Sequence, residues 1–233
     1  MASLPQAARV ASVTPAAEGV ARIRLDWEPG AGMAFRAGQW TILQTQDGER
    51  ALKRCFSIAS PPGDAAGLTY LVERTGAGGI SDWLHACKGG ERVEVRGPHG
   101  KLVVDEPVDA PLWFLAFDTG ISPVWSILQD LASRRTAGRF HLSYGWSGES
   151  GDPPLARELA DLARAWPALT VEIHPSEGAI ARIRKTLRGM ADARAFLAGR
   201  VRTLDPARQE LLDAGLDAGR ILEEPYDKPK PAP

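Results

Sequence analysis

Four consecutive residues, Arg54-Cys55-Phe56-Ser57, carry the groups needed to hold a flat, phosphorylated cofactor. An arginine can bind a pyrophosphate through two parallel hydrogen bonds. The ring of Phe56 can stack on a flat heterocycle, and the hydroxyl of Ser57 can donate to or accept from a ring nitrogen. On a strand, Arg54 and Phe56 share a face, while Ser57 points the other way unless the strand twists or bulges. Taken alone, the four residues also fit a strand with an exposed arginine and a core phenylalanine.

Two glycine-containing turns offer further places for a ligand. Gly78-Gly79-Ile80-Ser81 opens a predicted helix with Ser81 as its N-cap, and free N–H groups at a helix start attract phosphate. The turn at 116–123 joins a predicted buried strand to a helix, where open α/β sheets bind ligands. A plain N-cap and a bare strand–turn–helix are the alternatives, since the second turn holds one glycine and is a poor phosphate cradle.

The elements that must position these residues change character near residue 108. Before it, the segments 22–27, 40–44, 68–73 and 92–96 are short, β-rich and bounded by turn residues, which predicts an antiparallel β-barrel or sandwich. After it, strands at 112–117, 140–144, 169–173 and 195–198 alternate with helices at 121–135, 155–166, 180–190 and 205–214, with Pro206 at the start of the last helix. That alternation predicts an α/β domain with a parallel sheet.

We therefore expect two domains, an N-terminal β-barrel over residues 1–108 and an α/β domain over 109–226. The tail, 227–233, holds three prolines and two lysines and is expected to be disordered.

Composition excludes several classes of function. The 28 Lys and Arg balance 29 Asp and Glu, so no basic field draws nucleic acid or an anionic membrane. Two cysteines are too few for an iron–sulfur cluster, and the four scattered histidines predict no metal site. The chain shows no signal peptide and no apolar run of about 18 residues, which predicts a soluble cytoplasmic protein.

The order of the motifs resembles that of the ferredoxin–NAD(P) reductase superfamily over roughly residues 8–226. Six segments carry the resemblance: Phe35-Arg36-Ala37-Gly38-Gln39-Trp40, Arg54-Cys55-Phe56-Ser57, Gly78-Gly79-Ile80-Ser81, Gly97-Pro98-His99-Gly100, Asp118-Thr119-Gly120-Ile121-Ser122-Pro123 and Ile221-Leu222-Glu223-Glu224-Pro225-Tyr226. They are similar to the family's F-x-x-G-Q-[YF], R-x-[YF]-[ST], G-x-x-S, G-P-x-G, G-G-T-G-[IF]-[AS]-P and I-x-x-E-x-F motifs.

The resemblance implies FAD as the cofactor. Arg54 would hold the flavin phosphate, Phe56 would stack on the flavin, and Ser57 and Thr119 would face its reactive ring as the catalytic pair. The full set of implied flavin-binding residues is Arg54, Cys55, Phe56, Ser57, Leu71, Val72, Glu73, Gly79, Ile80, Ser81, Thr119 and Tyr226. Cys55 fits a small buried filler as well as a flavin contact.

The nucleotide half departs from the family pattern. Phe117-Asp118 replaces paired glycines, which predicts two side chains where a dinucleotide would pass and an unfavourable charge near its pyrophosphate. Ala198-Gly199-Arg200 replaces C-G-P and resembles the free-flavin reductase branch. The expected nucleotide-binding residues are Asp118, Gly120, Ile121, Pro123, Gly145, Trp146, Gly199 and Arg200. The segment after Tyr144-Gly145 lacks a basic residue, which favours NADH over NADPH.

Three functions follow as hypotheses. The first is a flavin oxidoreductase that takes a hydride from NAD(P)H and passes electrons to free flavin or a partner protein. The second is a flavin-binding electron-transfer subunit with a degenerate nucleotide site, reduced by another protein. The third, an interaction scaffold without flavin, is disfavoured by the intact Arg54, Phe56 and Ser57. The basic helical residues Arg182, Arg184, Lys185 and Arg188 form either a solvated face or a docking site for an acidic partner.

Overall fold

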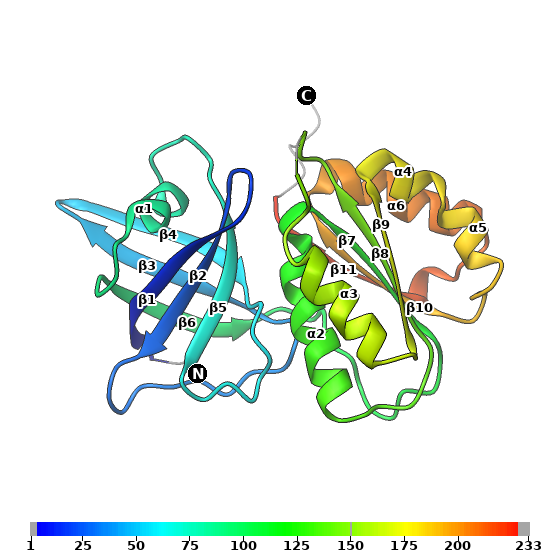
Figure 1. The fold of residues 1–233 in the computed structure, drawn as a ribbon, viewed down its shortest axis with the longest axis horizontal. Helices are drawn as coiled ribbons and strands as arrows, with labels where there is room; N and C mark the ends of the chain where they lie inside the picture. The colour runs from blue at the N-terminus through cyan, green and yellow to red at the C-terminus, as the bar shows by residue number, and fades with distance from the viewer. Residues whose placement is uncertain (1–3, 150, 228–233) are drawn as a thin grey trace.

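The computed structural model describes residues 4–149 and 151–227, which form two adjacent sheets (Figure 1). The first sheet contains β1 (Gln6–Ala17), β2 (Val20–Trp27), β3 (Trp40–Asp47), β4 (Arg50–Ser57), β5 (Gly67–Glu73) and β6 (Arg92–His99). Its strand order is β4-β3-β6-β1-β2-β5, and every paired strand is antiparallel. The end strands β4 and β5 approach each other, so the sheet curls toward a barrel.

Alternation of side chains builds the interior of this barrel. Along β2, Ile23 and Leu25 are buried while Arg22 and Arg24 are partly exposed, as the sequence pattern predicts. They join Leu43, Tyr70 and Val95 in one apolar cluster. The barrel is therefore stabilised by the inward half of each strand, and the outward half remains free for other roles.

A buried hydrogen bond inside the barrel gives a test of this packing. Thr41 Oγ1 and Tyr70 Oη are 2.8 Å apart, and both side chains are fully buried. We expect Thr41→Val to lower the free energy of unfolding by about 1–3 kcal/mol, because the tyrosine hydroxyl loses its partner. Urea unfolding of Thr41→Val, Tyr70→Phe and the double variant measures this. The double variant should lose less than the sum of the single losses, and simple additivity would contradict the pairing.

The second sheet is parallel. It contains β7 (Leu112–Phe117), β8 (Phe140–Trp146), β9 (Leu169–Pro175), β10 (Arg194–Gly199) and β11 (Ile221–Pro225), in the order β11-β10-β7-β8-β9. Helices α2 (Ile121–Ser133) and α3 (Ala156–Ala165) cover one face, and α4 (Ser176–Ala181), α5 (Ile183–Leu187) and α6 (Val201–Asp213) cover the other (Figure 1). Every residue of β7 is buried, as its continuous apolar sequence predicts.

Two predicted helices were wrong in detail. The segment 180–190 is not one helix, because α4 and α5 are separated at Arg182. The last long helix starts at Val201 instead of Asp205, so Pro206 lies inside it. The Asp227 carboxylate accepts the backbone N–H of Val201 at 2.7 Å, which stabilises the earlier start.

The two sheets meet through a shared core and specific hydrogen bonds. Ala37, Ala59 and Leu102 from the first part pack in one apolar cluster with residues of α2. Ser126 Oγ donates to the carbonyl of Ser60 at 2.7 Å. These contacts hold the segment that follows β4 against α2.

Candidate functional site: a flavin-binding junction

Three segments far apart in the sequence meet where the two sheets join. Ser57 ends β4, Thr119 lies in a short 3-10 helix after β7 (η1, Asp118–Gly120), and Tyr226 follows β11. The Tyr226 hydroxyl donates to the carbonyl of Thr119 at 3.0 Å, and it can accept from the neighbouring Ser57 hydroxyl. Burial raises the pKa of Tyr226, and the bond to Ser57 opposes this rise. The phenol therefore stays neutral and spans the junction.

Arg54 and Phe56 lie on the same side of β4, as predicted. Their cross-strand neighbours, Leu43 and Thr41, both point into the barrel. Arg54 is exposed, and its nearest polar contact is the hydroxyl of Ser81 at 3.4 Å. Phe56 is half-buried, with its ring centre 6.3 Å from that of Tyr70 in an edge-on arrangement. One cation and one exposed ring face therefore stand at the open side of the barrel.

The side chain of Asp82 fixes the conformation of the loop before α1 (Ile80–Ala86). Its carboxylate accepts the backbone N–H groups of Thr75, Gly76 and Gly78 at 2.8–2.9 Å. These bonds, that from Gly76 first, lower the pKa of Asp82 to about 2. Gly78 takes a φ of +66°, which favours glycine. The loop therefore keeps its shape at any pH above the acid range.

The sequence predicted Ser81 as the N-cap of α1, and this prediction was wrong. The helix begins at Ile80, its N-cap is Gly79, and no side chain caps it. The extended backbone of Gly79 lets the helix start two residues earlier, and Ser81 turns its hydroxyl toward Arg54. A Cβ added at Gly79 would meet no atom within 4 Å, so the space outside the loop is free.

The remaining predicted flavin-side residues divide by position. Leu71 and Val72 are buried in β5, and Glu73 is half-buried at its end. Cys55 is exposed on the opposite face of β4 from Arg54. Cys55 is thus not a buried filler, and the strand geometry points its thiol away from Phe56.

These residues fit FAD. Arg54 keeps donor groups free for a phosphate, the loop at Gly78-Gly79 leaves room beside it, and Phe56 offers a ring face. Ser57 and Tyr226 supply hydroxyl groups at the junction. The set contains a cation, an aromatic surface and hydrogen-bonding groups, which a phosphorylated flat heterocycle requires.

On the nucleotide side, Phe117 does not stand in a ligand path. It is 1% exposed and packs into the core under α4 and α6. A Cβ added at Gly145 would lie 2.5 Å from its ring, and one at Gly199 would lie 3.0 Å from its Cβ. The prediction was wrong for Phe117 because alternation along β7 points this side chain away from the junction.

Asp118 adopts a conformation that glycine favours. Its φ is +53°, a region that aspartate tolerates better than most residues. Its carboxylate accepts from the backbone N–H and the hydroxyl of Ser147, at 2.9 and 2.7 Å. The charge is therefore tied to the loop after β8 and fixes that loop against η1.

The other predicted nucleotide-binding residues gather at the carboxyl ends of the parallel strands. Gly120, Ile121 and Pro123 form the start of α2 and are buried. Gly145 is buried near the end of β8, and Gly199 ends β10. Arg200 follows Gly199, and its guanidinium reaches across the junction to the Glu73 carboxylate at 2.6 Å.

A cavity of about 270 Å³ opens beside the junction, bordered by Trp146. Its lining carries the carboxylates of Glu18, Glu73, Asp118 and Glu149, against the single arginine Arg74. The indole Nε1 of Trp146 is buried with no hydrogen-bond partner among the described residues. Sequence reasoning missed Glu18 and Arg74, because only the closure of β2 and β5 brings them to this loop.

Comparison with known proteins agrees with this geometry. Residues 7–104 match the family profile of the oxidoreductase FAD-binding domain. The chain is 33% identical over 177 residues to ferredoxin–NADP reductase B of Sorangium cellulosum, covering 75% of this chain and 71% of that protein. It is 33% identical over 144 residues to reductase component 1 of terephthalate 1,2-dioxygenase from Comamonas sp., covering 62% of this chain but only 42% of that protein.

The fold is also found in solved structures. Phthalate dioxygenase reductase superposes with a TM-score of 0.78 over 95% of this chain and 68% of that one, at 20% identity. Fold and site thus define an FAD-binding oxidoreductase with two sheets. The chain belongs to the ferredoxin–NAD(P) reductase superfamily, and its cofactor is FAD. Within the residues described, no helix has the length and apolar character to cross a membrane.

Proposed function

We propose that this chain takes a hydride from a nicotinamide nucleotide onto FAD and passes the electrons to a partner protein. The observation that carries the proposal is the junction of Ser57, Thr119 and Tyr226 between the two sheets. FAD accepts two electrons together and can release them singly, which is the chemistry it supplies when bound. The similar reductases from Sorangium and Comamonas support the same role. We propose that residues 1–108 and 109–226 form its two domains.

On the flavin side, each residue has a physical task. Arg54 binds the phosphate, with the backbone of Gly79, Ile80 and Ser81 beside it. Phe56 packs against the ring, and Ser57 hydrogen-bonds the ring edge. Leu71 and Val72 are buried in two different cores and support β5 behind the site. Tyr226 links the two sheets at the junction, since its hydroxyl donates to the Thr119 carbonyl and can accept from Ser57.

On the nucleotide side, three glycines allow close packing of the backbone. Gly120, Gly145 and Gly199 are buried, and they let the backbone segments pack closely at the carboxyl ends of the strands, where open sheets bind nucleotides. The ring of Trp146, which borders the cavity, offers an aromatic surface to the ligand. Held side by side, nicotinamide and flavin would react within one site, which removes the entropic cost of their encounter.

We propose NADH as the preferred donor. Glu73 in the cavity beside Trp146 is paired with Arg200, but the other lining carboxylates, Glu18, Asp118 and Glu149, still outnumber Arg74, so a 2′-phosphate would meet repulsion there. We expect Glu149→Arg to raise kcat/KM for NADPH by about tenfold, the effect of one charge-assisted hydrogen bond at a partly exposed site. Steady-state assays with both nucleotides measure this. Glu177→Arg, a charge change outside the cavity, is the control, and an equal gain in both variants would contradict the assignment.

The electron acceptor separates two forms of the proposal. If the natural acceptor is a partner protein, we expect rapid NADH-dependent reduction of ferricyanide, a one-electron acceptor, and slow reduction of added FMN. A free-flavin reductase predicts the opposite order, with FMN consumed catalytically. Steady-state assays with each acceptor test this, and activity with neither would contradict both forms.

A further inference from the structure

Strands β8 and β9 place polar side chains on the face that α4 and α5 cover. These residues are His141, Ser143, Thr170, Glu172 and His174. On the same face, β7 and β10 contribute apolar residues to the core. Strands covered on both sides are usually apolar, and burying polar groups without hydrogen bonds costs free energy. On β9, the edge strand, these polar residues are exposed or partly exposed, and on β8 the buried Ser143 accepts the indole N–H of Trp113 at 3.0 Å. His141 is the buried polar residue of the stripe that this packing does not account for.

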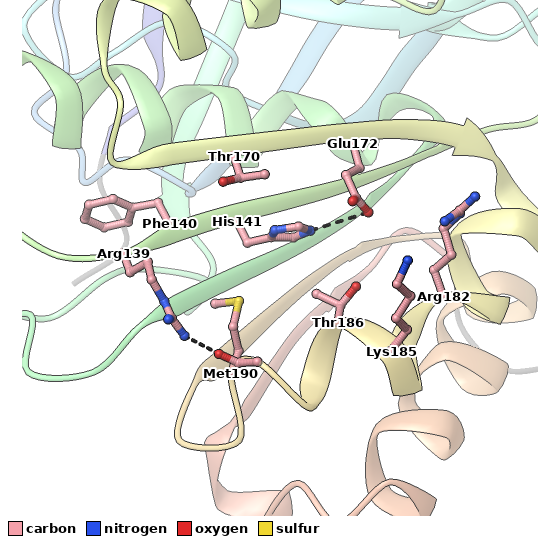
Figure 2. A pocket seen from close by; sticks show the side chains of 10 residues that line it. Arg139, Phe140, His141, Thr170, Glu172, Arg182, Lys185, Thr186 and Met190 are labelled. Carbon is pink, nitrogen blue, oxygen red and sulfur yellow. Dashed lines mark hydrogen bonds and ion pairs between the residues drawn. The ribbon is translucent and has the colours of Figure 1, made fainter.

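His141, Thr170 and Glu172 of this stripe form the floor of a cavity of about 290 Å³ (Figure 2). Arg139 borders it at the start of β8, and Arg182, Lys185 and Thr186 border it from the helices. The volume is near the lower end of the range for small-molecule sites. The cavity is therefore large enough for a small metabolite.

His141 is the group that points to a ligand. It is 9% exposed, and its Nε2 atom is buried with no hydrogen-bond partner among the described residues. Figure 2 shows its ring directed toward Glu172, whose Oε2 lies 3.8 Å away, beyond hydrogen-bonding distance. Unpaired buried atoms of this kind commonly mark a bound water or ligand. In the described chain, no group of three His, Cys, Asp or Glu side chains has metal-site geometry.

The charges around the cavity favour an anion. Arg139 donates to the carbonyl of Gly189, which fixes its guanidinium. Arg182 and Lys185 form no ion pair within the part of the chain that the structure describes, whereas the neighbouring Arg184 pairs with Glu210. Three cations against the single carboxylate of Glu172 leave an excess of two positive charges.

The cavity is separate from the flavin junction. Arg139 and His141 lie at the amino end of β8, while Trp146 at its carboxyl end borders the junction. All neighbouring strands are parallel, so the two ends face opposite edges of the sheet. A ligand here would not overlap FAD or its electron donor.

We propose that this cavity binds a small phosphomonoester that carries a hydroxyl group. A carboxylate has two oxygens, whereas the three cations, Thr186 and His141 offer more donors than two oxygens can accept. A phosphate group has three free oxygens. Glu172 repels the phosphate and needs a donor, which a hydroxyl elsewhere on the ligand supplies.

The test uses the FAD-loaded chain with inorganic phosphate and glycerol 3-phosphate as probes. Calorimetry gives the affinities, and the imidazole NMR resonances of His141 report the site. Both probes should bind and shift His141, with glycerol 3-phosphate the tighter. Lys185→Glu should weaken phosphate binding about tenfold or more, because one charge-assisted bond becomes a repulsion. In Glu172→Gln, phosphate should bind more tightly.

Arg188→Glu is the matched control, since Arg188 is exposed and lies outside the cavity. It should change phosphate affinity by no more than about twofold, the effect of a screened surface charge. Retained FAD binding shows that each variant is folded. Equal losses in both charge reversals, no shift of His141, or succinate binding as tightly as phosphate would overturn the proposal.

Discussion

Arg54→Ala is expected to weaken FAD binding by roughly 10- to 150-fold, the equivalent of about 1.5–3 kcal/mol for a hydrogen bond to a charged group. Arg54 is exposed, and its nearest polar contact is Ser81 Oγ at 3.4 Å. The protein therefore loses little internal stabilisation when the side chain is removed. Quenching of flavin fluorescence during titration of the apoprotein measures the affinity.

Lys53→Ala is the matched control for this prediction. Lys53 is the preceding residue on β4, also exposed and cationic, but it points to the other face. Its removal should leave FAD affinity unchanged. The FAD affinity of Arg54→Lys should lie between those of Arg54→Ala and Lys53→Ala, because lysine keeps the charge but lacks the planar guanidinium. An Arg54→Ala protein that binds FAD as tightly as Lys53→Ala would show that the phosphate lies elsewhere.

Gly120→Ala should destabilise the chain and disrupt the junction. An added Cβ would lie 2.1 Å from the carbonyl oxygen of Ala198, a backbone atom that cannot rotate away. Overpacking of this kind costs about 1–3 kcal/mol or more. Moving η1 would also shift the Thr119 carbonyl that accepts from Tyr226. We expect a lower free energy of unfolding in urea and slower flavin reduction by NADH.

Gly32→Ala controls for the loss of a glycine, because its added Cβ would meet no atom within 4 Å and its backbone does not require glycine. Its stability should change little. If Gly120→Ala matched it in stability and reduction rate, the close approach of η1 to β10 would have no role in holding the junction.

The sequence predicted the flavin side better than the nucleotide side for a physical reason. Arg54 and Phe56 lie on one regular strand, where residue spacing alone sets their shared face. Ser57 and Tyr226 meet only through packing of the two sheets, so no local sequence pattern predicts their contact. Only the family resemblance, not the periodicity of the sequence, assigned both residues to the flavin site.

The errors also have local causes. β1, from Gln6 to Ala17, was missed because it is rich in alanine, which has low strand propensity, and contains Pro15. Its central place in the sheet comes from pairing with β2 and β6. Asp118 looked like an obstruction because sequence alone gave neither its positive φ nor its bonds to Ser147.

The most direct test of the central claim is anaerobic stopped-flow mixing of the FAD-loaded chain with NADH. The account predicts a rapid loss of the oxidised-flavin absorbance, at a rate that saturates with NADH concentration, and a slower loss with NADPH. A flavin that dithionite reduces but neither nucleotide does would contradict it. The chain would then be an electron carrier that another protein reduces.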